Sequence, residues 1–142
     1  MTTMVKNVNL QSVTKTISNK QISDYANASG DRNPLHLDDK FAASTRFGGI
    51  IAHGMLTLAF VNEMFVRSFG EYWLQNGSLK VRFKGASYPK DRLAATGTLI
   101  NEAIDSNQHQ LNYSILLSNH KDEEIITGSI RVTVPKNDRD QL

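Results

Sequence analysis

The sequence contains no cysteine, and this absence excludes several kinds of chemistry at once. Disulfide bonds, thiolate metal ligands and a cysteine nucleophile are all ruled out. A chain without cysteine fits a reducing compartment, so the cytoplasm is the expected location. Closely spaced histidine pairs are also missing, so we expect no metal site. A metal site formed by His36 with Asp38 and Asp39 is a disfavoured alternative.

Long hydrophobic runs and charge blocks are also missing. Polar residues interrupt the most apolar stretch, residues 55–69, at Thr57, Asn62, Glu63, Arg67 and Ser68. We therefore expect neither a membrane span nor an export signal. The 16 Lys and Arg residues nearly balance the 14 Asp and Glu residues, which leaves a net charge of +2. Such a balance is not typical of a nucleic-acid-binding surface, so neither nucleic acid nor membrane is an expected partner.

The length of 142 residues is close to the commonest size of one compact domain, and no internal repeat divides it. We therefore expect a single domain over residues 1–142. Its second half alternates apolar and polar residues, which predicts strands near residues 79–84, 93–100, 111–118 and 126–134. Because the connections between them are short, these strands should pair antiparallel.

The first half has helical signals. Ser18 followed by Gln21 has the spacing of a capping box, and the helix it begins should end at Gly30. Asn33 precedes Pro34, so residues 31–36 should be an irregular loop. A second short helix should begin after Asp38, which would cap it.

Residues 53–69 predict a long helix whose polar stripe is too narrow for a surface helix. The predicted architecture is therefore α+β, with a curved antiparallel sheet wrapped around this central helix. A short overhanging helical segment would carry the loop of residues 31–36. The edge strands of such a sheet lack partners, so we expect a homodimer or a higher homo-oligomer.

One segment combines an acid and an imidazole on a constrained loop. Asp31 and His36 are five residues apart, with Gly30 permitting the turn and Pro34 restricting the backbone. The arrangement is typical of a preorganised acid–base pair. The alternative is a loop in which both side chains only satisfy local backbone groups.

A second segment, residues 48–55, leads into the long helix. Gly54 at the helix start would place an unpaired N–H group where a ligand carbonyl can approach it. It is therefore a candidate oxyanion donor, and tight helix-start packing is the alternative. His53 is interpreted as a hydrogen-bonding residue at the helix start rather than as a second base.

Together the two segments resemble the MaoC-like dehydratases and (R)-specific enoyl-CoA hydratases, a family with the hot-dog fold. The resemblance lies in Gly-Asp-x-Asn-Pro-Leu-His at residues 30–36 and Ile-Ala-His-Gly-Met at residues 51–55. Where members of the family often carry Pro-Val, this chain has Ala86-Ser87, and Lys90 stands where they have a turn glycine.

The resemblance implies reversible syn hydration of trans-2-enoyl thioesters to (R)-3-hydroxyacyl thioesters. Asp31 and His36 would be the catalytic dyad, Gly54 would hold the thioester oxygen, and Asn33 would support the loop. His53 and Asn62 are assigned to substrate binding, Asn62 because some hydratases carry a serine near the active site at its position. The substrate would be an acyl-CoA or an acyl-carrier-protein thioester, with no cofactor beyond the coenzyme A or pantetheine that it contains.

Two other functions remain open. A hot-dog thioesterase would need a carboxylate on the long helix, where Glu63 is the only one. A non-catalytic acyl-CoA-binding module would not need the dyad. Lys80, Arg82 and Lys84 share one face of a predicted strand, which is either a solvated face or a surface that meets the phosphates of coenzyme A.

Overall fold

The computed structural model describes residues 10–138. Within this range the chain forms, in order, β1 (Val13–Thr16), α1 (Asn19–Ser29), α2 (Pro34–Leu37), α3 (Asp39–Ala43), α4 (Gly54–Phe69), α5 (Glu71–Asn76), β2 (Gly77–Phe83), β3 (Arg92–Ile104), β4 (Gln108–Asn119) and β5 (Glu124–Pro135). None of the helices in this range has the length and apolar character needed to cross a membrane.

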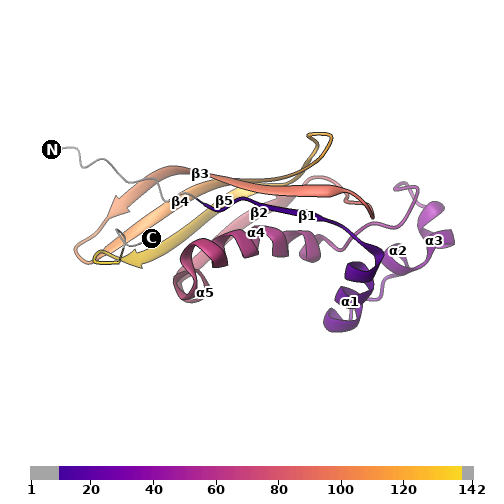
Figure 1. The fold of residues 1–142 in the computed structure, drawn as a ribbon, viewed down its shortest axis with the longest axis horizontal. Helices are drawn as coiled ribbons and strands as arrows, with labels where there is room; N and C mark the ends of the chain where they lie inside the picture. Colours follow the sequence, from indigo (N-terminus) through magenta and orange to yellow (C-terminus); the bar gives the residue numbers. More distant parts are fainter. Residues whose placement is uncertain (1–9, 139–142) are drawn as a thin grey trace.

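The strands form one antiparallel sheet in the order β1-β3-β4-β5-β2, and α4 lies along one face of it (Figure 1). The alternation in the sequence sets which side chains face α4. In β4, for example, Leu111, Tyr113, Ile115 and Leu117 are all buried. The predicted α+β architecture is confirmed, and a curved antiparallel sheet on a long helix is the hot-dog arrangement.

The core lies between α4 and the sheet. Val61, Met64 and Phe65 of α4 are fully buried, and the Phe65 ring meets the edge of Tyr113 with 5.4 Å between the centroids. Part of α4 is exposed among residues 10–138, and Met55 near its start is 58% exposed. The described strands therefore cover one side of the helix rather than its whole surface.

The helices α1, α2 and α3 project beyond one end of the sheet and form the expected overhang (Figure 1). Helix α1 begins with the predicted capping box, in which the Ser18 hydroxyl accepts from the Gln21 N–H. It ends at Gly30, whose φ of 80° is in the left-handed region that favours glycine.

Two local predictions for the helices differ from the structure. Residues 31–36 are not irregular throughout, because Pro34 begins α2 and the Asn33 side chain caps it by accepting from the Leu35 N–H at 3.0 Å. Helix α5 was not predicted. It follows the turn at Gly70 and buries Trp73 against the core.

Candidate active site

Asp31 directly follows the left-handed turn at Gly30, and its side chain is exposed. Its carboxylate accepts a hydrogen bond from the Asn33 N–H at 3.2 Å, and its own N–H donates to the Ser29 hydroxyl at 3.1 Å. Asn33 in turn caps α2. The polar side chains of the loop therefore bond to its own backbone, which holds the Asp31 carboxylate beside α2.

His36 lies on α2 and is partly buried. Its Nδ1 is 2.7 Å from the carbonyl oxygen of Ile51. A carbonyl oxygen can only accept, so Nδ1 must carry the hydrogen. In the neutral ring Nε2 then has a lone pair and can accept a proton.

His53 is the N-cap residue of α4 and is buried. By the same reasoning its Nε2 donates to the main-chain carbonyl of Asp31, at 2.9 Å. Its ring stacks on the ring of His36 and contacts Tyr25 at 4.8 Å between centroids. Its Nδ1 is buried without a hydrogen-bond partner among residues 10–138. His53 therefore joins the loop of Asp31 to the start of α4, as expected of a hydrogen-bonding residue at a helix start.

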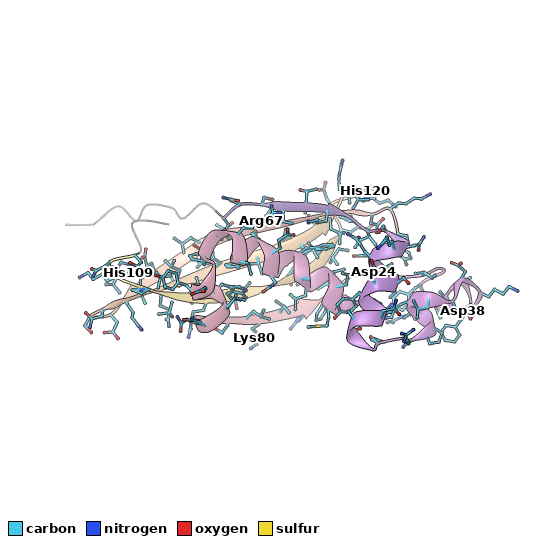
Figure 2. All side chains as sticks on the ribbon, turned by 60° about the horizontal axis from the view of Figure 1, so that its bottom comes forward. Asp24, Asp38, Arg67, Lys80, His109 and His120 are labelled. Atoms are coloured by element: carbon cyan, nitrogen blue, oxygen red, sulfur yellow. The ribbon has the colours of Figure 1, made fainter. Side chains whose placement is uncertain are left out.

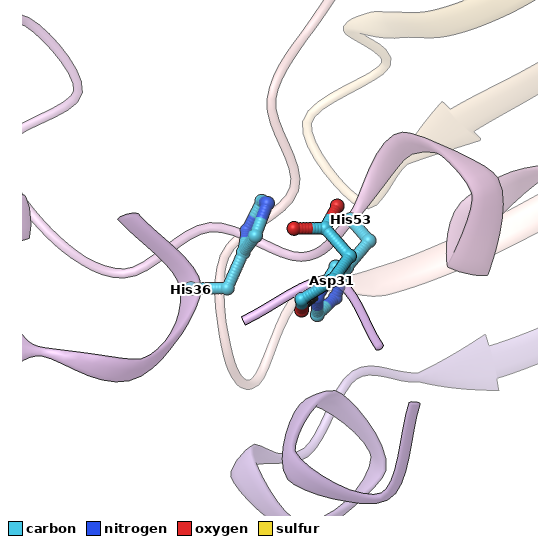
Figure 3. A group of neighbouring side chains, drawn as sticks. All are labelled: Asp31, His36 and His53. Carbon is cyan, nitrogen blue, oxygen red and sulfur yellow. Dashed lines mark hydrogen bonds between the residues drawn. The ribbon is translucent and has the colours of Figure 1, made fainter. Parts of the chain in front are cut away.

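Asp31, His36 and His53 form a compact group in which one nitrogen or oxygen atom from each side chain lies within 4.8 Å of those of the other two. In Figure 3 the Asp31 carboxylate lies next to the His36 ring, with His53 behind it. These distances alone would also admit a metal ion. The stacked rings do not favour one, because each nitrogen lone pair lies in its ring plane and the two planes differ by only 27°.

Among residues 10–138, the structure does not bring His36, Asp38 and Asp39 together as a group of metal-ligating atoms. The Asp38 carboxylate caps α3 by accepting from the N–H groups of Lys40 and Phe41 at 3.0 and 3.1 Å. Asp38 thus serves as the predicted helix cap.

Gly54 is the first residue of α4, and its N–H has no acceptor within the helix. It borders a cavity of about 350 Å³ that is lined by Tyr25, Asp31, His53, Gly54, Met55 and Phe83. A second cavity of about 250 Å³ also reaches Gly54 and Phe83 and extends to Arg46, Lys84 and Ser87. The acid, the imidazoles and the first amide of the helix therefore meet at one end of α4.

Asn62 is not part of this group. It lies eight residues further along α4 than Gly54, which corresponds to about 12 Å. Its side-chain oxygen accepts a hydrogen bond from the indole N–H of Trp73 at 2.6 Å. The structure thus gives Asn62 a contact with α5, and its assignment to substrate binding stays a prediction.

Three further residues of the cavity, Tyr25, Met55 and Phe83, were not assigned to the site from the sequence. Phe83 ends a strand in which alternate residues are apolar, so its side of the sheet was predictable. Its neighbour Gly54 is distant in the sequence. Only the folded chain brings the end of β2 against the start of α4, so no sequence signal identified this contact.

The fold is the hot-dog fold, and the chain belongs to the MaoC-like domain family, whose sequence profile matches residues 2–116. A 3-hydroxybutyryl-CoA dehydratase of Methylorubrum extorquens is 46% identical over 50 residues, which cover 35% of this chain and 32% of that protein. A 3-hydroxyacyl-thioester dehydratase Z of Mycobacterium tuberculosis is 33% identical over 89 residues, covering 60% and 59%.

These matches span about a third to three fifths of the length of the curated relatives. A solved (R)-hydratase from A. caviae superposes with a TM-score of 0.73 at 23% identity, over 86% of this chain and 91% of that chain. This similarity shows that the two proteins share a fold.

Proposed function

We propose that this protein catalyses the reversible hydration of trans-2-enoyl thioesters to (R)-3-hydroxyacyl thioesters. The observation that carries the proposal is the meeting of Asp31, His36 and the Gly54 amide at one end of α4. The names of the two similar dehydratases support the same reaction class. The reaction would require no cofactor apart from the coenzyme A or pantetheine of the substrate.

Water activation would depend on Asp31 and His36. A water molecule between them would donate one hydrogen bond to the Asp31 carboxylate and one to Nε2 of His36. The bond from Nδ1 to the Ile51 carbonyl supports this role, because it leaves Nε2 free to accept. The oxygen of the water would then attack the β-carbon as a proton passes to the dyad, and the dyad would return a proton to the α-carbon.

Gly54 would stabilise the negative charge that develops on the thioester oxygen during this attack. Its N–H is at the positive end of a 16-residue helix and has no intrahelical acceptor. A donor of this kind typically contributes about 10²–10³ in rate. Because the water and the returned proton come from the same side, addition would be syn, and dehydration would be the reverse.

The alternative of a thioesterase receives no support from the position of Glu63. Its carboxylate is paired with Arg67 at 2.7 Å and with Lys15 at 3.3 Å. It also lies about 13 Å along α4 from Gly54. A non-catalytic binding module would show no turnover at all.

The test is to incubate crotonyl-CoA with the protein, follow loss of the enoyl thioester absorbance and determine the configuration of the product. We expect (R)-3-hydroxybutyryl-CoA without release of free thiol. Release of free thiol would instead identify a thioesterase, and binding without turnover would identify a binding module.

We also propose that two copies associate through β2. This strand is at the edge of the sheet, its exposed Leu79 and Phe83 are on the α4 side, and Phe83 lines the same cavity as the exposed Met55 of α4. These three side chains are 42%, 50% and 58% exposed. Pairing β2 with its copy would satisfy the edge of the strand and would help to cover the open side of α4.

A further inference from the structure

The outer face of β2 and β5 carries cations that the proposed chemistry does not use. Phe83 and Leu79 lie opposite the buried Ile126 and Ile130, so they share the α4 side of the sheet. Lys80 and Arg82 therefore project from the other side, where they lie opposite Ser129 and Thr127. Figure 2 labels Lys80 on this edge strand.

These side chains surround a hollow of about 350 Å³, lined by Lys80, Val81, Arg82, Lys84, Thr127, Gly128 and Ser129. Its polar lining consists of two hydroxyl groups and three cations. Hydroxyl, guanidinium and ammonium groups are all hydrogen-bond donors to phosphate oxygens.

The positive charge of the hollow is largely uncompensated. Lys84 is paired with Glu124 at 2.7 Å. Among residues 10–138, no carboxylate lies within ion-pair distance of Lys80 or Arg82. The two residues are two positions apart on a strand, or about 7 Å. Their spacing suits a ligand with more than one anionic group.

The hollow adjoins the second cavity of the candidate active site. Lys84 lines both the hollow and the second cavity, which reaches Gly54 and Arg46. A substrate whose thioester oxygen lies at Gly54 would extend past Lys84 to reach the outer face of β2. The reacting end of such a substrate is uncharged, whereas the far end of a coenzyme A thioester carries a pyrophosphate and a ribose phosphate.

We propose that Lys80 and Arg82 form the subsite for the phosphates of coenzyme A, with Thr127 and Ser129 as hydroxyl donors. This inference rests on the proposed function, because that function places the thioester oxygen at Gly54 and so sets where the coenzyme A end of the substrate lies. It also selects coenzyme A over a carrier protein as the natural carrier, because a hollow of this size accommodates phosphates rather than a protein surface.

The test compares coenzyme A with pantetheine, which lacks the phosphates. Binding of each compound is measured by calorimetry for the parent protein and for the double variant Lys80→Glu/Arg82→Glu. Turnover of crotonyl-CoA and crotonyl-pantetheine is measured in parallel. The control is Lys136→Glu, which changes another exposed cation, just beyond the C-terminal end of β5.

We expect the double variant to weaken coenzyme A binding about tenfold and to raise the KM for crotonyl-CoA by a similar factor, since solvated charge pairs are individually modest. Binding of pantetheine, and the kcat and KM for crotonyl-pantetheine, should not change. Lys136→Glu should change the binding of neither compound. If charge reversal disturbs the fold, as judged by circular dichroism, Lys80→Gln/Arg82→Gln should give a smaller shift of the same kind.

The proposed subsite would be overturned if the double variant bound coenzyme A and pantetheine equally more weakly, or if it bound both as tightly as the parent protein does. The proposal would also be overturned if the double variant lost turnover with an acyl-carrier-protein thioester but kept it with crotonyl-CoA. A failure of the proposed function looks different, because the parent protein would then turn over neither crotonyl thioester. The binding measurements would still decide the subsite in that case.

Discussion

The imidazole ring of His36 lies on the ring of His53, with 3.9 Å between the centroids and 27° between the planes. The same His53 donates its ring N–H to the main chain of Asp31. One buried residue thus contacts both members of the proposed dyad, although it comes from a different segment of the chain.

His53→Ala should therefore lower both stability and turnover. Loss of a buried ring should reduce the free energy of unfolding by about 2 kcal/mol, measured in urea. Because His53 positions the dyad and takes no proton in the proposed step, kcat should fall while the shape of the pH profile of kcat/KM stays the same. A variant with parent kcat would contradict this positioning role.

Asp31→Asn and His36→Ala should each lower kcat by at least about a hundredfold, because each removes a proton acceptor. In Asp31→Asn the side-chain amide oxygen can still accept from the Asn33 N–H, so this variant should unfold as cooperatively as the parent protein. Asp24→Asn is the matched control, since Asp24 is an exposed carboxylate on α1 that pairs with Lys20. A fully active Asp31→Asn protein would disprove the mechanism.

Gly54→Ala should separate activity from stability. Gly54 has no positive φ, so alanine is compatible with its backbone. The added Cβ would lie 3.1 Å from the Phe83 ring, which is half exposed and can shift. We expect the free energy of unfolding to stay within about 1 kcal/mol of the parent value. Turnover should fall about a hundredfold, because the added methyl group holds the substrate carbonyl away from the amide.

Gly49→Ala serves as the control for this substitution. An added Cβ at Gly49 meets nothing within 4 Å, and Gly49 also has no positive φ. It should therefore retain activity. If Gly54→Ala hydrates crotonyl-CoA at the parent rate, Gly54 is only a helix-start residue.

Light scattering at micromolar concentration should give the mass of a dimer or of a larger assembly. Leu79→Glu places a charge on the exposed apolar side of β2 and should shift the mass towards the monomer. The control is Ile100→Glu, because Ile100 is 61% exposed but lies on β3 rather than on β2. This substitution should leave the mass unchanged. A monomeric parent protein would rule out the proposed association.

The contact between α5 and the end of β5 should make stability depend on pH at alkaline values. Tyr72 donates a hydrogen bond to the Asp138 carboxylate, and this bond, with smaller effects of burial and of the charges of Asp138 and Glu71, raises the pKa of the Tyr72 hydroxyl. The folded state therefore keeps a proton that the unfolded state loses above a pH of about 10.

The contribution of this contact is present below a pH of about 10 and is lost as pH rises through the folded pKa. Tyr72→Phe should remove part of the alkaline decline in the free energy of unfolding, measured in urea between about pH 9 and pH 11. Identical declines in both proteins would show that Tyr72 is not responsible.

Much of the candidate site was predictable because short-range rules govern its loops. Gly30 ends α1 in the left-handed conformation, Asp38 caps α3, and α4 begins at Gly54, all as the sequence indicates. The helix α2 was missed, because proline was interpreted only as a restriction on the preceding residue and not as a first helical residue.

The sequence by itself therefore determined the order and type of most elements, the sides of the strands that face the core and the loop that carries Asp31 and His36. Periodicity and caps are local properties, so they can be read along the chain. The tertiary structure alone decided that His53 stacks on His36, that Phe83 borders Gly54 and that Lys84 adjoins two cavities. These contacts join segments far apart in the sequence, and their geometry depends on how the sheet packs on α4, which no local pattern encodes.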